Sequence, residues 1–77
     1  MGEEKIRARI RALLEILPEP YRKKALSTFT KLLKTSSIVE RRVYKGRIIT
    51  FFCEGLKTSN RKNKTLCKEL RMMLRKI

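Results

Sequence analysis

Basic and hydroxyl side chains recur at helical spacing in the stretch from residue 21 to residue 34. At 100° per residue, one arc carries Lys23, Ser27, Thr30, Lys31 and Lys34, and Lys24 and Thr28 flank it. No acidic residue occurs from position 20 to 39, whereas an ordinary exposed helix mixes signs because Glu–Lys pairs four residues apart stabilise it. Ammonium and hydroxyl groups at this spacing suit hydrogen bonds to an anionic partner. A purely solvated helix face is the competing interpretation.

A second group of donors lies within RRVYKGRII, residues 41–49. It comprises Arg41, Arg42, Tyr44, Lys45 and Arg47. Two roles are open for Tyr44, which are a hydrogen bond to a phosphate and packing against Arg47. For the charged residues, the alternative to a contact with a partner is simple exposure to solvent.

The charge balance indicates a polyanionic partner. The 77-residue chain has 21 Lys and Arg against 7 acidic residues, a formal charge of +14. Such self-repulsion opposes compaction, so we expect a partner, with nucleic acid favoured and an anionic membrane surface second. A generally basic surface with no specific partner is the alternative. The apolar content of 42% is enough for a globular core, and the length predicts a single domain over residues 1–77.

Several residue types that carry chemistry are missing from the sequence. It has no His, Asp, Trp or Gln, and its seven Glu are scattered. The commonest general base and the usual Asp metal ligands are therefore absent, and no nucleophile–base pair can be recognised from spacing. We expect no enzymatic activity, metal, cofactor or small-molecule ligand. The scarcity of Asn and Gln beside many Lys and Arg also fits a heat-adapted source.

The apolar runs are too short to span a membrane, and the N-terminal residues lack the apolar core of a signal peptide. We therefore expect a cytoplasmic protein.

Cys53 and Cys67 form no CxxC motif. They are interpreted either as small buried apolar residues or as a single disulfide, which would join a strand predicted for residues 47–53 to a helix predicted for residues 61–76.

Three helices are predicted from apolar residues at a 3.6-residue period, over residues 3–17, 21–34 and 61–76. A stiff corner at residues 18–20 separates the first two, because proline disfavours helix in the residue before it. The apolar stripes comprise Ile6, Ile10, Leu13, Leu14 and Leu17, then Tyr21, Ala25, Leu26, Phe29, Leu32 and Leu33, and finally Leu66, Leu70, Met73, Leu74 and Ile77.

Residues 38–53 are predicted to form a β-hairpin. SIVERRVY and RIITFFC are rich in β-branched and aromatic residues, and Lys45-Gly46 suits a two-residue turn. That turn would place Val43 opposite Ile48, Arg41 opposite Thr50 and Val39 opposite Phe52. The basic residues would then gather at the tip of the hairpin.

The order of helix, corner, helix and basic-tipped hairpin resembles the winged helix-turn-helix family, in particular small regulators of archaeal viruses and plasmids. The residues that carry the resemblance run from Ile6 to Phe52, and SIVERRVYKGRIITFF is the nearest local match. The resemblance implies an α+β fold of order α-α-β-β-α with a two-stranded antiparallel wing. The family has three helices before its wing, whereas two are predicted here. The last helix is therefore expected either to fill the vacant place or to form a homodimer.

The function expected from this pattern is sequence-specific binding of double-stranded DNA by a transcription regulator, inside the host cell of a virus or plasmid. The second helix would enter the major groove through Lys23, Lys24, Ser27, Thr28, Thr30, Lys31 and Lys34. The wing would lie on the backbone or in the minor groove through Arg41, Arg42, Tyr44, Lys45 and Arg47. An RNA-binding, ribosome-associated protein and a viral-type inhibitor of a nucleic-acid-binding partner are the alternatives.

Overall fold

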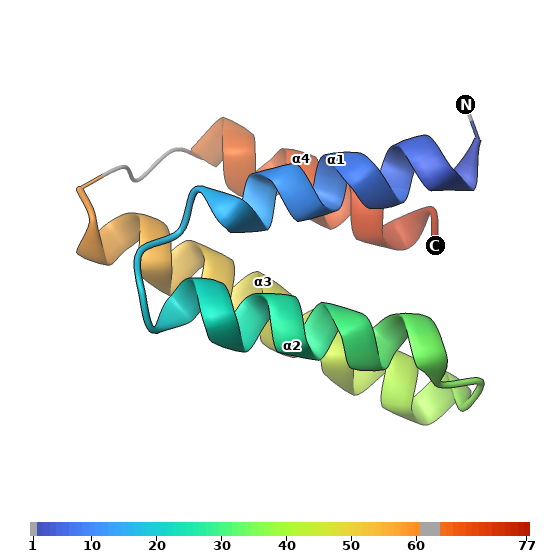
Figure 1. Cartoon of the computed structure of the whole chain (residues 1–77). Coiled ribbons are helices and arrows are strands. Elements are labelled where there is room, and N and C mark those ends of the chain that lie inside the picture. The colour runs from blue at the N-terminus through green and yellow to red at the C-terminus, as the bar shows by residue number, and fades with distance from the viewer. Residues whose placement is uncertain (1, 61–63) are drawn as a thin grey trace.

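The described part of the chain is a bundle of four helices. The computed structural model describes residues 2–60 and 64–77, and its elements are α1 (Glu3–Glu15), α2 (Tyr21–Lys34), α3 (Ile38–Thr58) and α4 (Lys64–Arg75). Successive helices run in opposite directions, with α1 and α4 in one layer and α2 and α3 in the other (Figure 1). Each helix packs against the next, and α4 closes the bundle against α1. No described residue forms a strand, so the predicted α+β winged helix-turn-helix fold was wrong.

The error lies in residues 38–53, which belong to one helix. Ser37 caps α3 by accepting a hydrogen bond from the backbone N–H of Glu40 at 3.3 Å. The Glu40 carboxylate in turn accepts from the Thr35 hydroxyl at 2.9 Å, and the Ser37 N–H donates to that same hydroxyl at 3.2 Å. Ser-x-x-Glu is a helix N-terminal signature, because the side chains satisfy N–H groups that have no partner within the helix.

The burial pattern of α3 explains why residues 38–53 form a helix and not the predicted hairpin. Ile48, Phe52 and Leu56 are buried at intervals of four residues, whereas Thr50 and Glu54 between them are exposed, which requires a helical period. The predicted cross-strand pairs would have placed Ile48, Thr50 and Phe52 together on one face, so Thr50 would have been buried with them, whereas it is exposed. The strand preference of β-branched residues is weak and depends on context, so burial against neighbouring helices overrides it.

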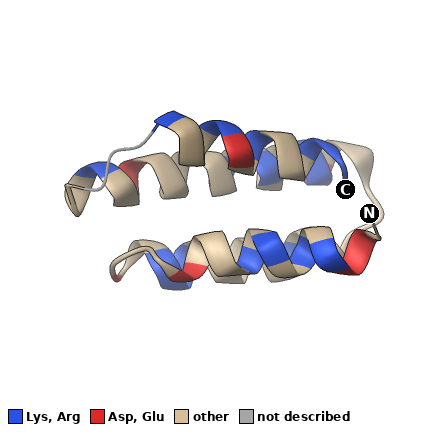
Figure 2. Cartoon of the chain, turned by 90° about the horizontal axis from the view of Figure 1, so that it is seen from above, with Lys and Arg blue, Asp and Glu red and all other residues tan. Residues whose placement is uncertain are grey.

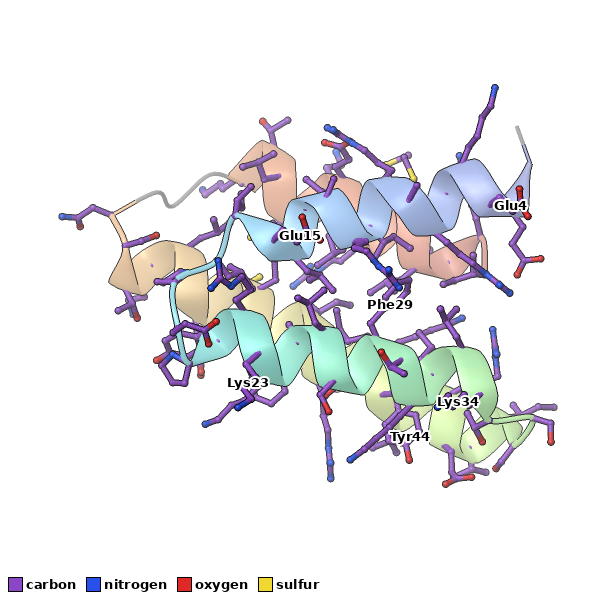
Figure 3. The ribbon with its side chains drawn as sticks, in the orientation of Figure 1. Glu4, Glu15, Lys23, Phe29, Lys34 and Tyr44 are labelled. Carbon is purple, nitrogen blue, oxygen red and sulfur yellow. The ribbon has the colours of Figure 1, made fainter. Side chains whose placement is uncertain are left out.

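The three predicted apolar stripes form the core together with α3. All five residues of the first stripe are buried, as are Ala25, Phe29 and Leu32 of α2 and Leu70 and Leu74 of α4. The remaining predicted stripe residues are half-buried around them. Phe29 projects from α2 toward the other layer (Figure 3). The apolar residues of α4, the helix that was expected either to fill the vacant place or to form a homodimer, therefore pack largely against the other helices of the same chain.

Gly55 allows α3 to approach the corner between α1 and α2. A Cβ atom at this position would lie 2.8 Å from Leu17 Cδ2 and 3.1 Å from Tyr21 Cβ. Leu17 is itself buried, so its side chain has little room to move. The approach fixes the start of α2 against the last turns of α3, as the predicted Pro18–Pro20 corner requires.

The connection after α3 begins with a helix-ending turn. The Ser59 N–H donates to the Gly55 carbonyl at 3.1 Å, and Asn60 adopts a φ of 58°. Asparagine tolerates this left-handed conformation, which commonly ends a helix. Residues 61–63, predicted as the start of the last helix, lie outside the described residues. Across the described residues, no helix is long and apolar enough to cross a membrane.

The two helical glycines of α3 give a direct test of the corrected fold. A Cβ atom added at Gly46 would meet no other atom within 4 Å, so Gly46→Ala should raise the free energy of unfolding by about 0.5–1 kcal/mol. Gly55→Ala gains the same helix propensity but overpacks the corner, which typically costs about 1–3 kcal/mol, so it should destabilise. Urea denaturation followed by circular dichroism measures both. Destabilisation by Gly46→Ala would instead support a turn with positive φ, as in the hairpin.

Candidate nucleic-acid interface

The outward side of α2 is a basic surface of the kind the sequence predicted. Lys23, Lys24, Ser27, Lys31 and Lys34 are all exposed, and we call these five residues the lysine face. Lys23 projects away from the layer of α1 and α4 (Figure 3). The buried residues Ala25, Phe29 and Leu32 anchor the opposite side of the helix. The lysine face is therefore carried on an element that the core holds in place.

The hydroxyl groups near the lysine face differ in what they can offer a partner. The Thr28 hydroxyl donates to the Lys24 carbonyl at 2.8 Å, and the Thr30 hydroxyl donates to the Leu26 carbonyl at 3.0 Å. Their protons are thus used within α2, whereas the Ser27 hydroxyl makes no hydrogen bond to another described side chain or backbone group. Ser27 is accordingly the hydroxyl of this surface best able to donate outward.

Thr30 is also separated from the other predicted contact residues. It borders a shallow hollow with Arg11, Glu15 and Leu26, which places it on the side of α2 toward α1. Thr28 lies on the opposite side, toward α3. A partner that lies along the lysine face would therefore meet Ser27 at its centre and Thr30 only at its edge.

An open groove runs between the lysine face and α3. It has a volume of about 400 Å³ and is lined by Pro20, Lys23, Lys24, Ser27, Thr28, Lys31 and Phe51. Phe51 is half-buried and supplies an apolar floor between basic walls. The place of Phe51 in this groove follows only from the helical geometry of α3. The groove combines cations with one aromatic ring, a pairing found in proteins that bind nucleic-acid strands.

The acidic residues leave the lysine face uncompensated. Three ion pairs occur among the described residues, each at 2.8 Å, and they join Arg7 to Glu3, Arg9 to Glu69 and Arg22 to Glu19. Viewed from above, α1 and α4 carry segments of both signs (Figure 2). None of the three pairs uses a lysine of α2. Positive potential is therefore less neutralised along the lysine face than on the layer of α1 and α4.

The predicted wing does not exist, and its residues are distributed around α3. Arg41 is half-buried, and its guanidinium donates to the carbonyls of Leu32 and Thr35 at 3.3 and 3.5 Å and to the main-chain oxygen of Ile77. Leu32 belongs to the last turn of α2, where carbonyls lack helical partners. Arg41 therefore ties the end of α2 to the end of the chain instead of presenting its charge to a partner.

The other predicted wing residues face different directions because they belong to a helix. Lys45 is half-buried beside α4, near Arg71 and Arg75. The pKa of its ammonium is lowered mainly by desolvation and secondly by the charge of Arg41. The Tyr44 hydroxyl lies 3.5 Å from Glu40 Oε2, within its own helix. At 100° per residue, Arg47 is on the Phe51 side of α3, whereas Arg42 is on the Lys45 side.

Of the five predicted wing residues, only Arg42 and Arg47 are exposed. Arg47 lies one turn before Phe51 on the same side of α3, so it extends the basic surface of the α2–α3 groove. The candidate interface therefore consists of the lysine face, the groove beside it and Arg47. The sequence predicted the α2 part, but the helical state of α3 decides which of the arginines joins it.

Arg41 and Arg42 form a matched pair for testing these assignments. Arg41→Ala should lower the free energy of unfolding by about 1.5–3 kcal/mol, because it removes charge-assisted hydrogen bonds to helix-end carbonyls. Arg42→Ala should change it by less than about 0.5 kcal/mol, since Arg42 is exposed. Chemical denaturation of both variants measures the difference. Equal effects would contradict the inward role of Arg41.

The geometry gives no sign of a metal centre, because the described residues contain no cluster of three or more metal-ligating side chains. The α2–α3 groove and the lysine face are thus equipped for electrostatic and hydrogen-bonding contacts with an anion.

Comparison of the chain with protein-family models, with curated proteins and with solved structures returned no match.

Proposed function

We propose that the protein binds double-stranded DNA through the lysine face of α2, and that it regulates transcription by binding selected sequences. The observation that carries the proposal is the lysine face itself, which is exposed, lacks acidic residues and is anchored from behind by buried Phe29. Four lysines in fourteen residues are placed to neutralise phosphates, which supplies most of the affinity of DNA-binding proteins.

The dimensions of α2 suit the major groove of B-DNA. A helix of 14 residues is about 21 Å long, and the groove, about 12 Å wide, admits an α-helix. Small Ser27 at the centre of the face lets the helix backbone approach base edges, while the lysines around it reach bases or phosphates. Phosphate contacts would hold the helix in register, and Ser27 and Lys31 would contribute the sequence preference.

Arg47 and Phe51 support contacts beside α2. A DNA strand that lies along the groove would pass the Arg47 guanidinium, which suits phosphate oxygens. This contact replaces the wing in the proposal and needs no β-structure. The proposal requires only one copy of the chain, and a symmetric binding site would indicate the homodimer considered from the sequence.

Binding measurements with three lysine or arginine variants test this proposal. Sites would first be selected from a random duplex pool, and affinities for a selected and a scrambled duplex then measured across salt concentrations. Lys31→Ala should weaken binding and narrow the difference between the two duplexes. Arg47→Ala should weaken both about equally and reduce the slope of log affinity against log salt by about one.

Lys5→Ala is the matched control, because Lys5 is an exposed lysine on α1 and its removal changes the net charge by the same amount. It should alter the affinity and the salt slope less than Lys31→Ala does. Equal losses in the two variants would show that binding does not use the lysine face. Stronger competition by structured RNA than by duplex DNA would favour the RNA-binding alternative, and recovery of a protein without nucleic acid would favour the inhibitor.

A further inference from the structure

Two thiols from different helices meet on the side of α3 that faces α4. Cys53 of α3 and Cys67 of α4 are both free, and the Cys53 thiol donates a hydrogen bond to Cys67 Sγ at 3.1 Å. The two residues are separated by the connection between these helices, which includes residues 61–63. A disulfide has an S–S distance of about 2.05 Å, so joining the sulfurs needs a movement of only about 1 Å.

The thiol pair is open to solvent through a second groove. This thiol groove has a volume of about 550 Å³ and is lined by Cys53, Glu54, Lys57, Lys64, Cys67, Lys68 and Arg71. Both cysteines are half-buried, so each packs against neighbours while contributing to the lining. A reagent that enters the groove therefore meets both sulfurs, which distinguishes them from cysteines that only fill space in a core.

The charges around the thiol groove are strongly unequal. Among the described residues that line it, four are cationic and one, Glu54, is acidic. A concave surface with charges of one sign concentrates small ions of the opposite sign and raises their rate of encounter. The groove therefore favours small anionic reagents over small cationic ones.

We propose that Cys53 and Cys67 form a redox-active dithiol, which small anionic disulfides oxidise to a disulfide between α3 and α4. The chemistry is thiol–disulfide exchange, and the small disulfide is the oxidant. The Cys67 thiolate attacks one sulfur of the reagent, so a mixed disulfide forms and one small thiolate leaves. Cys53 then loses its proton to solvent and attacks the Cys67 sulfur, and the second small thiolate leaves. Two protein thiols are oxidised, and one small disulfide is reduced to two thiols.

The hydrogen bond between the sulfurs assigns their order of reaction. Burial first, and the hydrogen bond to Cys67 second, raise the pKa of Cys53 to about 11. Cys53 is therefore a thiol at neutral pH, and its S–H is directed at the Cys67 sulfur. We therefore assign the first attack to Cys67 and the second to Cys53, because a thiol with a raised pKa is the poorer first nucleophile.

The test treats the reduced protein with glutathione disulfide, which is anionic, or with cystamine, which is cationic, at equal concentration and pH. Alkylation of the remaining thiols and intact mass follow the reaction. We expect both thiols to disappear with the loss of two hydrogens and no retained adduct. Glutathione disulfide should react roughly tenfold faster than cystamine at low salt, with the difference shrinking as salt screens the groove. Unreacted thiols, a lasting adduct or a faster reaction with cystamine would overturn the proposal.

Variants separate the two parts of the proposal. Cys53→Ala should stop the reaction at a stable mixed disulfide on Cys67, because the resolving sulfur is gone. Lys68→Glu should reduce the preference for glutathione disulfide, whereas Lys5→Glu, an equal charge change on exposed α1, should leave it closer to that of the natural sequence. An unchanged preference in Lys68→Glu would contradict the role of the groove.

Thermal unfolding of the oxidised protein provides a check that does not depend on rates. A bond between residues 53 and 67 closes a short loop, which should raise Tm by roughly 10 °C if the folded geometry accepts it. A fall in Tm on oxidation would show that the disulfide distorts the packing of α3 against α4 and would contradict the proposal.

Discussion

The burial of Phe52 organises both surfaces of this protein. Phe52 is completely buried between Ile48 and Leu56, and this stripe directs α3 into the core. Since adjacent helical residues differ by 100°, the residues on either side of Phe52 must face away from each other. Phe51 therefore borders the groove with α2, and Cys53 borders the groove with α4. Phe51 and Cys53 are only two residues apart in sequence, yet they belong to different grooves. α3 cannot rotate to change this arrangement without exposing Phe52.

Periodicity predicted most of the helical fold, and it failed where two periods competed. The extent of α2 was predicted as residues 21–34, and the first predicted stripe is buried in full. In residues 38–53, clusters of β-branched and aromatic residues suggested strands. The Ser37-x-x-Glu40 cap indicates a helix, and so do apolar Ile48, Phe52 and Leu56 with polar Thr50 and Glu54 between them. Both helical signals are present in the sequence, and in the folded chain they outweigh the local strand preference.

The candidate interface was predictable only in the part that depends on one helix. The exposure of Lys23, Lys31 and Lys34 follows from the period of α2 alone. The inward direction of Arg41 does not, because its acceptors are on Leu32 of α2 and on Ile77 after α4, which only the packing of the bundle brings to Arg41. The meeting of Cys53 and Cys67 is likewise a tertiary contact. The sequence allowed such a pairing, but only the packing of α4 against α3 brings the sulfurs together.

The cations of this chain divide into two kinds by what their side chains do. Among the described residues, the side-chain hydrogen bonds from cationic groups all come from arginines, to carboxylates in the case of Arg7, Arg9 and Arg22 and to carbonyls in the case of Arg41. Arginine has a planar set of donors that holds such geometry, whereas the lysine ammonium is compact, strongly hydrated and carried on a flexible stem. Arginines thus make several hydrogen bonds within the bundle, whereas the lysines of α2 are directed toward water. A partner with many phosphates, as proposed for DNA, could replace that water without breaking any of these arginine bonds.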